Sequence, residues 1–364
     1  MKKTRITALL LSIVMTAALL GGCGKKSKSD DTDTDTKNVI EIKEATDMHE
    51  VGDMKAVHRD GYVISEFTGE WIEERLENQR PVTVMINNIS DAMPQSGLSD
   101  ADIIYEMIVE GGITRLMGVF KDYENLPKLG SVRSCRQYYV QISDMMNAIY
   151  AHVGQSWLGE EWLIKTGIDD LNGLSGYASY TTFYRDNTRY APHNCYTDGP
   201  KIVAGIEGLG YSREYTNRHD DMFKFNYEDT PIGSGLKADK VTTKFANGYA
   251  PRFEYNAEEG VYYRFQYGKP HMDEYYGIQL SFKNVIIMFA GYSTLPDGLR
   301  DIDWDKGGAG YYVSDGEYKS ITWSKDSNGI IKLYDENGKQ LKMNPGKTFV
   351  TVFDDTIPEN IIFE

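Results

Sequence analysis

The segment Leu20–Cys23 constrains this chain more than any other feature, because it marks where the mature polypeptide begins. It follows a basic start at residues 2–5 and an apolar run over residues 6–20. Secretory signal peptides have this order of a basic region, about 7–15 apolar residues and small residues at the cleavage site. A cysteine directly after the cut can carry a diacylglycerol on its sulfur. The sequence therefore predicts a signal peptide over residues 1–22 and lipidation, with palmitate as an acyl chain, at Cys23.

The predicted lipid would hold the mature chain on the outer face of the cell membrane. The alternative is an ordinary transmembrane helix, which needs about 20 apolar residues to cross a bilayer. The apolar run is shorter than that and ends in small residues, so we favour cleavage and lipidation. We expect an extracytoplasmic lipoprotein that contacts the membrane through lipid on Cys23.

Composition divides the mature chain into a tether and two domains. Residues 23–60 are rich in charge and contain an alternating Asp-Thr run at 31–36, which buries too little apolar surface to offset the entropy of ordering. Domains commonly hold about 100–200 residues, so two are expected in the remainder. We predict an N-terminal domain over 61–228 and a C-terminal domain over 237–364, joined by the Gly-rich segment Thr230–Leu236.

The net charge excludes one class of partner. The chain has 39 Lys and Arg against 54 Asp and Glu, which gives a formal net charge of −15. Nucleic-acid binders need clustered positive charge to neutralise phosphates, so we expect no nucleic-acid partner. The histidines and cysteines lack the spacing of a zinc site, and no phosphate-cradling loop of the Walker type occurs. No metal or other cofactor is therefore predicted.

The N-terminal half mixes strands with helices. Short β-branched runs bounded by turns are typical of buried strands, and a Gly-Gly step supplies the positive φ angles of a tight hairpin. We predict strands over 81–87, 103–109, 113–120 and 148–153, a hairpin turn at Gly111–Gly112, and helices over 134–146 and 157–165. This mixture predicts an α/β domain of packed layers.

The C-terminal half consists mainly of short strands. Asp-Gly and Asn-Gly pairs at 315–316, 328–329 and 337–338 are strong hairpin signals. We predict strands over 241–245, 261–266, 285–289, 311–313, 318–323, 330–334 and 349–353. The predicted fold is thus a mixed α/β N-terminal domain followed by a mostly antiparallel β C-terminal domain.

Two residue types have an open interpretation. The chain holds 26 Tyr, which suit stacking on sugars or peptides, but Tyr is also common in strands, and that interpretation is preferred. Cys135 and Cys195 remain after Cys23, and export permits a disulfide between them. Two cysteines are too few for a disulfide framework, so two separate buried thiols are preferred.

Several short motifs occur together along the chain. They are Pro94–Leu98, Ala101–Glu106, Glu110–Arg115, Val132–Ser134 with Arg136, Ala191–Asn194, Asn284–Ile286, Thr322–Ser324 and Pro345–Thr348. Together they resemble the YerB-like family of lipoproteins, a family of unknown function with N- and C-terminal domains. The resemblance extends from about Arg80 onward and implies a membrane-tethered lipoprotein with an α/β and a β-rich domain. It implies no particular activity. Cys135 stands where the family usually has a small residue, which argues against a nucleophilic thiol.

A set of basic residues forms the candidate ligand site. Arg133 and Arg136 flank Ser134, where a helix is predicted to start, and helix N-termini bind anions readily. The planar guanidinium also matches phosphate or carboxylate. The full candidate set is Arg115, Arg133, Arg136, Arg185, Arg189, His193 and Asn194. The alternative is that the arginines hold the fold by pairing with Asp102, Glu106, Glu110 and Asp186.

Two histidines are candidates for acid–base chemistry. His152 and His193 could serve because imidazole titrates near neutral pH, although a lone histidine more often packs or caps. The favoured function is binding of an anionic cell-envelope component or an envelope protein. The alternative is an enzyme that acts on a cell-envelope polymer by hydrolysis or group transfer, with one of these histidines as the base.

Overall fold

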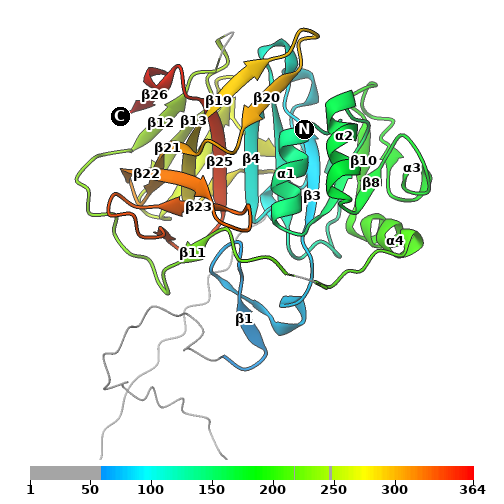
Figure 1. Cartoon of the computed structure of the whole chain (residues 1–364), viewed down its shortest axis with the longest axis horizontal. Coiled ribbons are helices and arrows are strands. Elements are labelled where there is room, and N and C mark those ends of the chain that lie inside the picture. Colours follow the sequence, from blue (N-terminus) through cyan, green and yellow to red (C-terminus); the bar gives the residue numbers. More distant parts are fainter. Residues whose placement is uncertain (1–58, 217, 246–247) are drawn as a thin grey trace, which may run out of the picture. The chain divides into compact units, whose positions relative to one another are not determined.

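The computed structural model describes residues 59–216, 218–245 and 248–364 (Figure 1). The predicted signal peptide, the lipidated Cys23 and the tether up to residue 58 lie outside the described residues. All described residues belong to one unit, Glu50–Glu364. Among them, no helix combines the length and the hydrophobicity needed to cross a bilayer.

The largest sheet in the described part of the chain contains eleven strands drawn from both halves of the sequence. In spatial order they are β23 (Ile331–Tyr334), β22 (Glu317–Lys325), β21 (Gly308–Ser314), β19 (Asn284–Thr294), β25 (Thr348–Asp354), β4 (Ile103–Ile108), β5 (Thr114–Phe120), β3 (Val82–Asn87), β7 (Ile149–His152) and β8 (Asp170–Asn172), with β20 (Arg300–Asp303) paired to β19. Strands β21, β22 and β23 are antiparallel, whereas β19, β25 and β4 run parallel to one another.

A second sheet belongs to the C-terminal half. Its order is β15 (Lys269–Pro270), β14 (Val261–Gln266), β13 (Arg252–Asn256), β12 (Lys240–Thr243) and β26 (Ile361–Phe363), with β18 (Ser281–Phe282) paired to β14. Three two-stranded pairings join β1 (Tyr62–Ile64) to β2 (Trp71–Glu73), β11 (Lys224–Phe225) to β24 (Lys342–Met343), and β16 (Met272–Asp273) to β17 (Ile278–Gln279). A three-stranded sheet has β10 (Cys195–Thr197) between β6 (Leu129–Gly130) and β9 (Tyr184–Arg185).

The helices lie in the N-terminal half. The described α-helices are α1 (Gln137–Met145), α2 (Trp157–Thr166), α3 (Ala178–Thr181) and α4 (Gly199–Leu209). Short 3-10 turns occur at Glu74–Leu76, Ser90–Ala92, Leu98–Asp100 and Glu110–Gly112 in the same half, and at Pro358–Asn360 near the C-terminus. Ser156 caps α2 by accepting a hydrogen bond from the Gly159 N–H, and Asp198 caps α4 in the same way. Both helices end at a glycine in the left-handed conformation, as helices commonly do.

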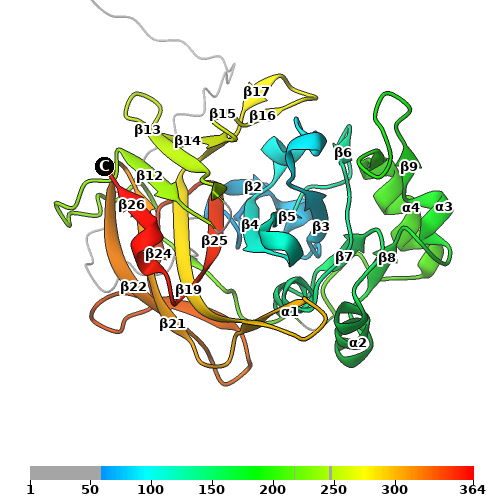
Figure 2. The same ribbon diagram turned by 90° about the horizontal axis from the view of Figure 1, so that it is seen from above.

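Side chains on the two faces of the large sheet enter separate cores, because successive residues of a strand point to opposite faces. Ile286 of β19 joins the core that contains α1, whereas Val285 and Ile287 join the core formed with α4 and the second sheet. Figure 2 shows α1 and the strands β12–β14 on opposite sides of β19, β25 and β4. Burial on both faces explains why all six residues of β3 are buried and why its sequence does not alternate between apolar and polar residues.

The predicted fold class is confirmed: the N-terminal half mixes helices and strands, and antiparallel pairing dominates the C-terminal half. Each predicted strand has a counterpart, and the predicted Gly111–Gly112 turn has positive φ at both glycines. Asp315 and Gly316 also both have positive φ between β21 and β22. The elements that the predictions missed include α3, α4, β8, β13, β20 and β26.

The prediction that a helix starts at Ser134 is wrong, because α1 begins at Gln137. The segment before it is extended: the Arg133 N–H donates to the Met85 carbonyl of β3 (2.9 Å), and the Val153 N–H donates to the Arg133 carbonyl (3.0 Å). The backbone N–H and carbonyl groups of this segment are therefore hydrogen-bonded to two neighbouring segments and do not need helical partners.

The two predicted domains share the large sheet. Strand β25 from the C-terminal half pairs in parallel with β4 from the N-terminal half, and β11 pairs with β24 across the same division. The division into domains at 61–228 and 237–364 stays a prediction, and the shared sheet indicates that the two halves depend on each other to fold.

Candidate anion-binding site

Arg133 is the residue around which the candidate site is built. Its Nη1 donates to the Pro192 carbonyl oxygen at 3.4 Å, and its Nε is buried without a hydrogen-bond partner. Burial lowers the pKa of the Arg133 guanidinium, and the positive charges of Arg136 and Arg185 lower it further. Arg133 is thus a half-buried cation surrounded by charges of the same sign, an environment that a bound anion would stabilise.

Arg115, at the start of β5, approaches the same segment from the sheet. Its side chain is buried, and Nη1 donates to the Ser134 carbonyl oxygen at 2.5 Å. Burial lowers the pKa of Arg115 to about 10, and the charge of Arg136 adds to that effect. A carbonyl oxygen satisfies one of its five N–H groups but does not neutralise its charge.

Arg136 has an internal partner. Its Nε and Nη2 donate to the two carboxylate oxygens of Glu110 at 2.7 and 2.6 Å, a bidentate ion pair. Burial alone would raise the pKa of Glu110, but the hydrogen bonds and charge of Arg136 outweigh it, and the net shift is downward. Arg136 therefore serves mainly to fix the segment before α1 against the hairpin at Gly111–Gly112.

His193 faces the end of β3. Its Nδ1 lies 2.7 Å from the amide nitrogen of Asn87. Since an amide nitrogen can only donate, Nδ1 accepts, and the ring carries its proton on Nε2. Burial and then the charge of Arg133 lower the pKa of His193, while Asp91 opposes the shift. A neutral imidazole that offers an N–H group is suited to donate a hydrogen bond to a ligand.

The other predicted residues divide between this cluster and a neighbouring contact. Arg185 is exposed at the end of β9 and donates to the side-chain oxygen of Asn194 at 3.2 Å. Arg189 points elsewhere: it donates to the carbonyls of Met93 (3.2 Å) and Pro94 (2.8 Å) and pairs with a carboxylate on the β16–β17 turn. The structure thus brings Arg115, Arg133, Arg136, Arg185, His193 and Asn194 together and places Arg189 beside them.

The alternative of internal ion pairs applies to two of the arginines. Glu110 pairs with Arg136, as the alternative predicts, whereas Arg189 pairs with Glu274, which is not among the predicted partners. The remaining expected partners have other roles: Asp102 accepts from the Lys121 N–H, Glu106 pairs with Arg264, and Asp186 pairs with Lys128.

The candidate base His152 and the thiol of Cys135 are enclosed. The His152 side chain has no exposed surface, and its Nδ1 and Nε2 face the Gly154 carbonyl (2.8 Å) and Asp170 (3.0 Å). Burial raises the pKa of Cys135 to about 12, so the thiolate is not formed near neutral pH. Cys135 and Cys195 are both free and buried, as the preferred interpretation predicted.

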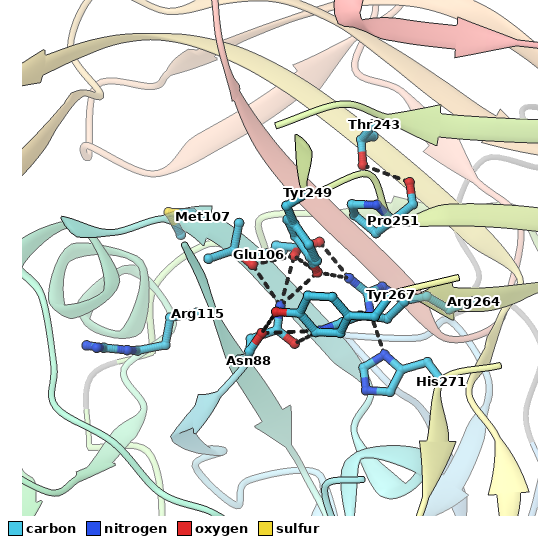
Figure 3. Close-up of polar contacts among 12 residues, drawn as sticks. Asn88, Glu106, Met107, Arg115, Thr243, Tyr249, Pro251, Arg264, Tyr267 and His271 are labelled. Atoms are coloured by element: carbon cyan, nitrogen blue, oxygen red, sulfur yellow. Dashed lines mark hydrogen bonds and ion pairs between the residues drawn. The ribbon is translucent and has the colours of Figure 1, made fainter. Parts of the chain in front are cut away.

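A buried polar network lies beside this site and was missed from the sequence (Figure 3). Glu106 of β4 pairs with Arg264 of β14 at 2.8 Å, and both side chains are completely buried. The other carboxylate oxygen accepts from Asn88 (3.0 Å), Thr114 (2.7 Å) and Tyr249 (2.9 Å). In Figure 3 the Arg115 side chain points away from Glu106. The network therefore joins the two halves of the chain, and Glu106 forms no ion pair with Arg115.

His271 extends the network from β15–β16. Its Nδ1 faces Arg264 Nη1, and its Nε2 donates to Gln95 at 2.6 Å. Burial, followed by the charge of Arg264, holds the pKa of His271 well below its ordinary value. The presence of Glu106 and Gln95 in the short motifs of the N-terminal half was the available signal. Arg264 and His271, their partners in the C-terminal half, lie 158 and 176 residues away, so spacing could not reveal them.

Comparison with known proteins assigns the chain to a family. Residues 67–212 match the "Protein of unknown function (DUF3048) N-terminal domain", and residues 241–350 match the corresponding C-terminal domain. The chain belongs to the DUF3048 family. It is 32% identical over 294 residues to a Bacillus subtilis (strain 168) protein named "Putative lipoprotein YerB", which covers 79% of this chain and 85% of that protein.

A solved crystal structure is also similar to this chain. The crystal structure of the YerB protein from Bacillus subtilis superimposes with a TM-score of 0.72 at 28% sequence identity, covering 83% of this chain and 99% of that one. The family resemblance predicted from the short motifs is confirmed. The lipoprotein assignment is supported by the name of the relative, and the family descriptions state no biochemical activity.

Proposed function

We propose that this protein is a membrane-anchored lipoprotein whose folded part binds an anionic group of a cell-envelope polymer on the outer side of the membrane. The cleavage and lipidation segment predicted at Leu20–Cys23 and the lipoprotein name of the relative support the lipid anchor. The cations Arg115, Arg133 and Arg185 support the ligand site, with His193 as a hydrogen-bond donor.

The observation that carries the proposal is the lack of a direct ion pair for these cations, although Glu110, which Arg136 binds, offsets part of the charge of Arg115. Among the described residues, no carboxylate forms an ion pair with Arg115, Arg133 or Arg185, although the chain has 54 acidic residues. Two of the three are at least half-buried and repelled by neighbouring arginines. Burial of a charge without an ion-pair partner is unfavourable. An anionic ligand bound among Arg115, Arg133 and Arg185 would therefore be stabilised by all three.

The tautomer of His193 favours binding over catalysis. A general base needs an unprotonated nitrogen that faces the substrate. Asn87 occupies Nδ1, so the nitrogen left for a ligand carries a proton. His152, the other candidate base, is completely buried. The alternative, an enzyme acting on an envelope polymer, lacks an accessible base among these two residues.

The site can be tested with inorganic phosphate as the probe. The mature chain carrying Cys23→Ser, which cannot be lipidated at that position, is titrated with phosphate by calorimetry. We expect Arg133→Gln to weaken binding by about 10- to 100-fold, because a charge-assisted hydrogen bond contributes about 1.5–3 kcal/mol. Arg252→Gln is the matched control: it removes one positive charge from the second sheet, where Arg252 pairs with Glu254. Equal affinity in the two variants would refute the site.

The anchor and the enzymatic alternative need separate experiments. A fatty-acid probe should label the wild-type chain in cells and leave Cys23→Ser unlabelled; absence of label from both chains contradicts the anchor. For the alternative, purified protein is incubated with cell-wall polymer and the soluble products are analysed by mass spectrometry. Products that disappear with His193→Ala would establish an enzyme in place of a binder.

A further inference from the structure

We propose that the ligand is a sugar phosphate chain, whose phosphate lies on the arginine cluster and whose sugar rings stack on an adjacent set of exposed tyrosines. This inference rests on the proposed function and specifies the class of polymer. The set, called the tyrosine rim below, comprises Tyr190, Tyr267, Tyr275 and Tyr276.

The tyrosine rim is exposed although most large apolar side chains of the chain are buried. Its exposed fractions are 90% for Tyr190, 45% for Tyr267, 52% for Tyr275 and 43% for Tyr276. Single exposed aromatic residues are common on protein surfaces. Here Tyr267 bonds residues 87–96 directly, and Tyr190 and Tyr275 follow residues that do so, which gathers exposed rings into a larger feature of the kind that marks binding sites.

The segment Asn87–Ser96 places the arginine cluster and the rim on the same part of the molecule. On one side, Asn87 holds His193, and the Met93 and Pro94 carbonyls accept from Arg189, which fixes the loop that carries Tyr190. The neighbouring residue, Asn88, accepts a hydrogen bond from the Tyr267 hydroxyl through its carbonyl oxygen at 2.9 Å. Since consecutive Cα atoms are about 3.8 Å apart, His193 and Tyr267 attach to almost the same point of the chain.

The β16–β17 turn closes the arrangement. Glu274 accepts hydrogen bonds from Ser96 (3.0 Å) and Arg189 (2.8 Å), and its own N–H donates to the Gln95 carbonyl at 2.7 Å. Tyr275 and Tyr190 directly follow Glu274 and Arg189 in the sequence. Arg189 and Glu274 form an ion pair. Their chain neighbours Tyr190 and Tyr275 are therefore carried on two segments that contact each other.

The rim tyrosines on the C-terminal half are preoriented. The Tyr276 hydroxyl donates to Asp100 at 2.9 Å, and the Tyr275 ring packs edge-on against it with centroids 4.9 Å apart. The Tyr267 ring lies 5.3 Å from that of Tyr249. Because the hydroxyls of Tyr267 and Tyr276 already have protein acceptors, ring surface is what they offer a ligand. Aromatic faces that are already fixed lose little conformational entropy when a ligand packs on them.

The combination of charge and ring surface selects the ligand class. Guanidinium groups match phosphate geometry, and the C–H face of a sugar ring stacks on an aromatic ring whose edge is otherwise engaged. A bare phosphate would use only the arginines, and a neutral sugar would use only the rim. A sugar phosphate chain uses both, and the extra contacts should raise its affinity above that of either part.

The test compares three probes on the mature Cys23→Ser chain: mannopentaose phosphate, mannopentaose and inorganic phosphate. We expect the sugar phosphate to bind about tenfold or more tightly than phosphate, since each stacked ring contributes about 0.5–1.5 kcal/mol. Tyr275→Ala and Tyr190→Ala should weaken sugar phosphate binding several-fold and leave phosphate binding unchanged. Tyr180→Ala is the matched control, because Tyr180 is a 73% exposed tyrosine of α3 that packs on Tyr177.

The outcomes separate this inference from the proposed function. If phosphate binds through Arg133 but the sugar phosphate binds no more tightly, or the rim variants do not matter, the sugar class is refuted and the anion site stands. If a phosphoserine peptide of similar length competes better than the sugar phosphate, the ligand is an acidic peptide and the inference is wrong. If neither phosphate compound binds, the proposed function fails as well.

Discussion

Replacing Glu106 with Gln should strongly lower the free energy of unfolding, although the two side chains are almost the same size. Glu106 receives hydrogen bonds at both carboxylate oxygens, and its Oε2 faces Arg264 at 2.8 Å with no exposed surface on either side chain. Glu106→Gln removes the negative charge and places an amide N–H group where an acceptor is required. Arg264 would then be a buried cation without a counter-charge.

The magnitude follows from the burial of this pair. Removing one partner of a buried ion pair costs about 3–5 kcal/mol, because the remaining charge is desolvated and uncompensated. The pair Arg252–Glu254 on the second sheet has partly exposed side chains, and exposed pairs contribute at most about 1 kcal/mol. We therefore expect Glu106→Gln to lower the free energy of unfolding by about 3–5 kcal/mol, and Arg252→Gln by no more than about 1 kcal/mol.

Urea denaturation followed by circular dichroism and tryptophan fluorescence measures both values. Arg264→Met alone and the double variant Glu106→Gln/Arg264→Met complete the cycle, since the double variant removes the cation that Glu106→Gln leaves uncompensated. We expect the double variant to be more stable than the sum of the single losses by at least about 1 kcal/mol. Strictly additive losses, or a loss below about 1 kcal/mol for Glu106→Gln, would refute the argument that this network joins the two halves.

The same structure leads to three further predictions. Because the pKa of His271 in the folded state lies well below the unfolded value near 6.5, only the unfolded chain takes up a proton as the pH falls below about 6.5. Stability measured by urea denaturation should therefore decrease on acidification below that pH, and His271→Asn should reduce the decrease; an unchanged pH profile would contradict this. Cys135 and Cys195 should not react with a thiol reagent in the native state and should both react in urea, whereas native reactivity would show that they are accessible. Residues 59–228 and 237–364 expressed separately should lack cooperative unfolding, because each loses the β4–β25 pairing, and their co-expression should restore it; two independently folded halves would refute this.

Local sequence patterns predicted most of the fold. The strands β3, β4, β5 and β25 are short apolar runs between turn residues, and their pattern depends only on neighbours in sequence. The order in which the strands pair, in contrast, depends on residues that are far apart in the sequence. The junction of β25 with β4 connects residues about 245 positions apart, and nothing in either strand specifies the other beyond its burial on both faces.

The helix start at Ser134 illustrates the limit of local signals. Ser is a favourable N-cap, and the residues that follow form a helix, so the pattern favours helix from that point. The Met85 and Val153 backbones instead pair with Arg133 and keep the segment extended for three more residues. Tertiary hydrogen bonding overrode the local preference, and as a result Arg133 reaches the site from an extended segment instead of a helix N-terminus.

The charge of the candidate site likewise depends on partners far along the chain. In the sequence, the arginines have nearby acidic residues in the same motifs, and internal pairing is the natural expectation. Arg264, which lies 158 residues from Glu106, pairs with that carboxylate, and Lys128 pairs with Asp186. Once these carboxylates have other cations, Arg115 and Arg133 retain only carbonyl oxygens. The uncompensated positive charge is therefore a consequence of how the two halves associate, and a variant that weakens that association should also weaken anion binding.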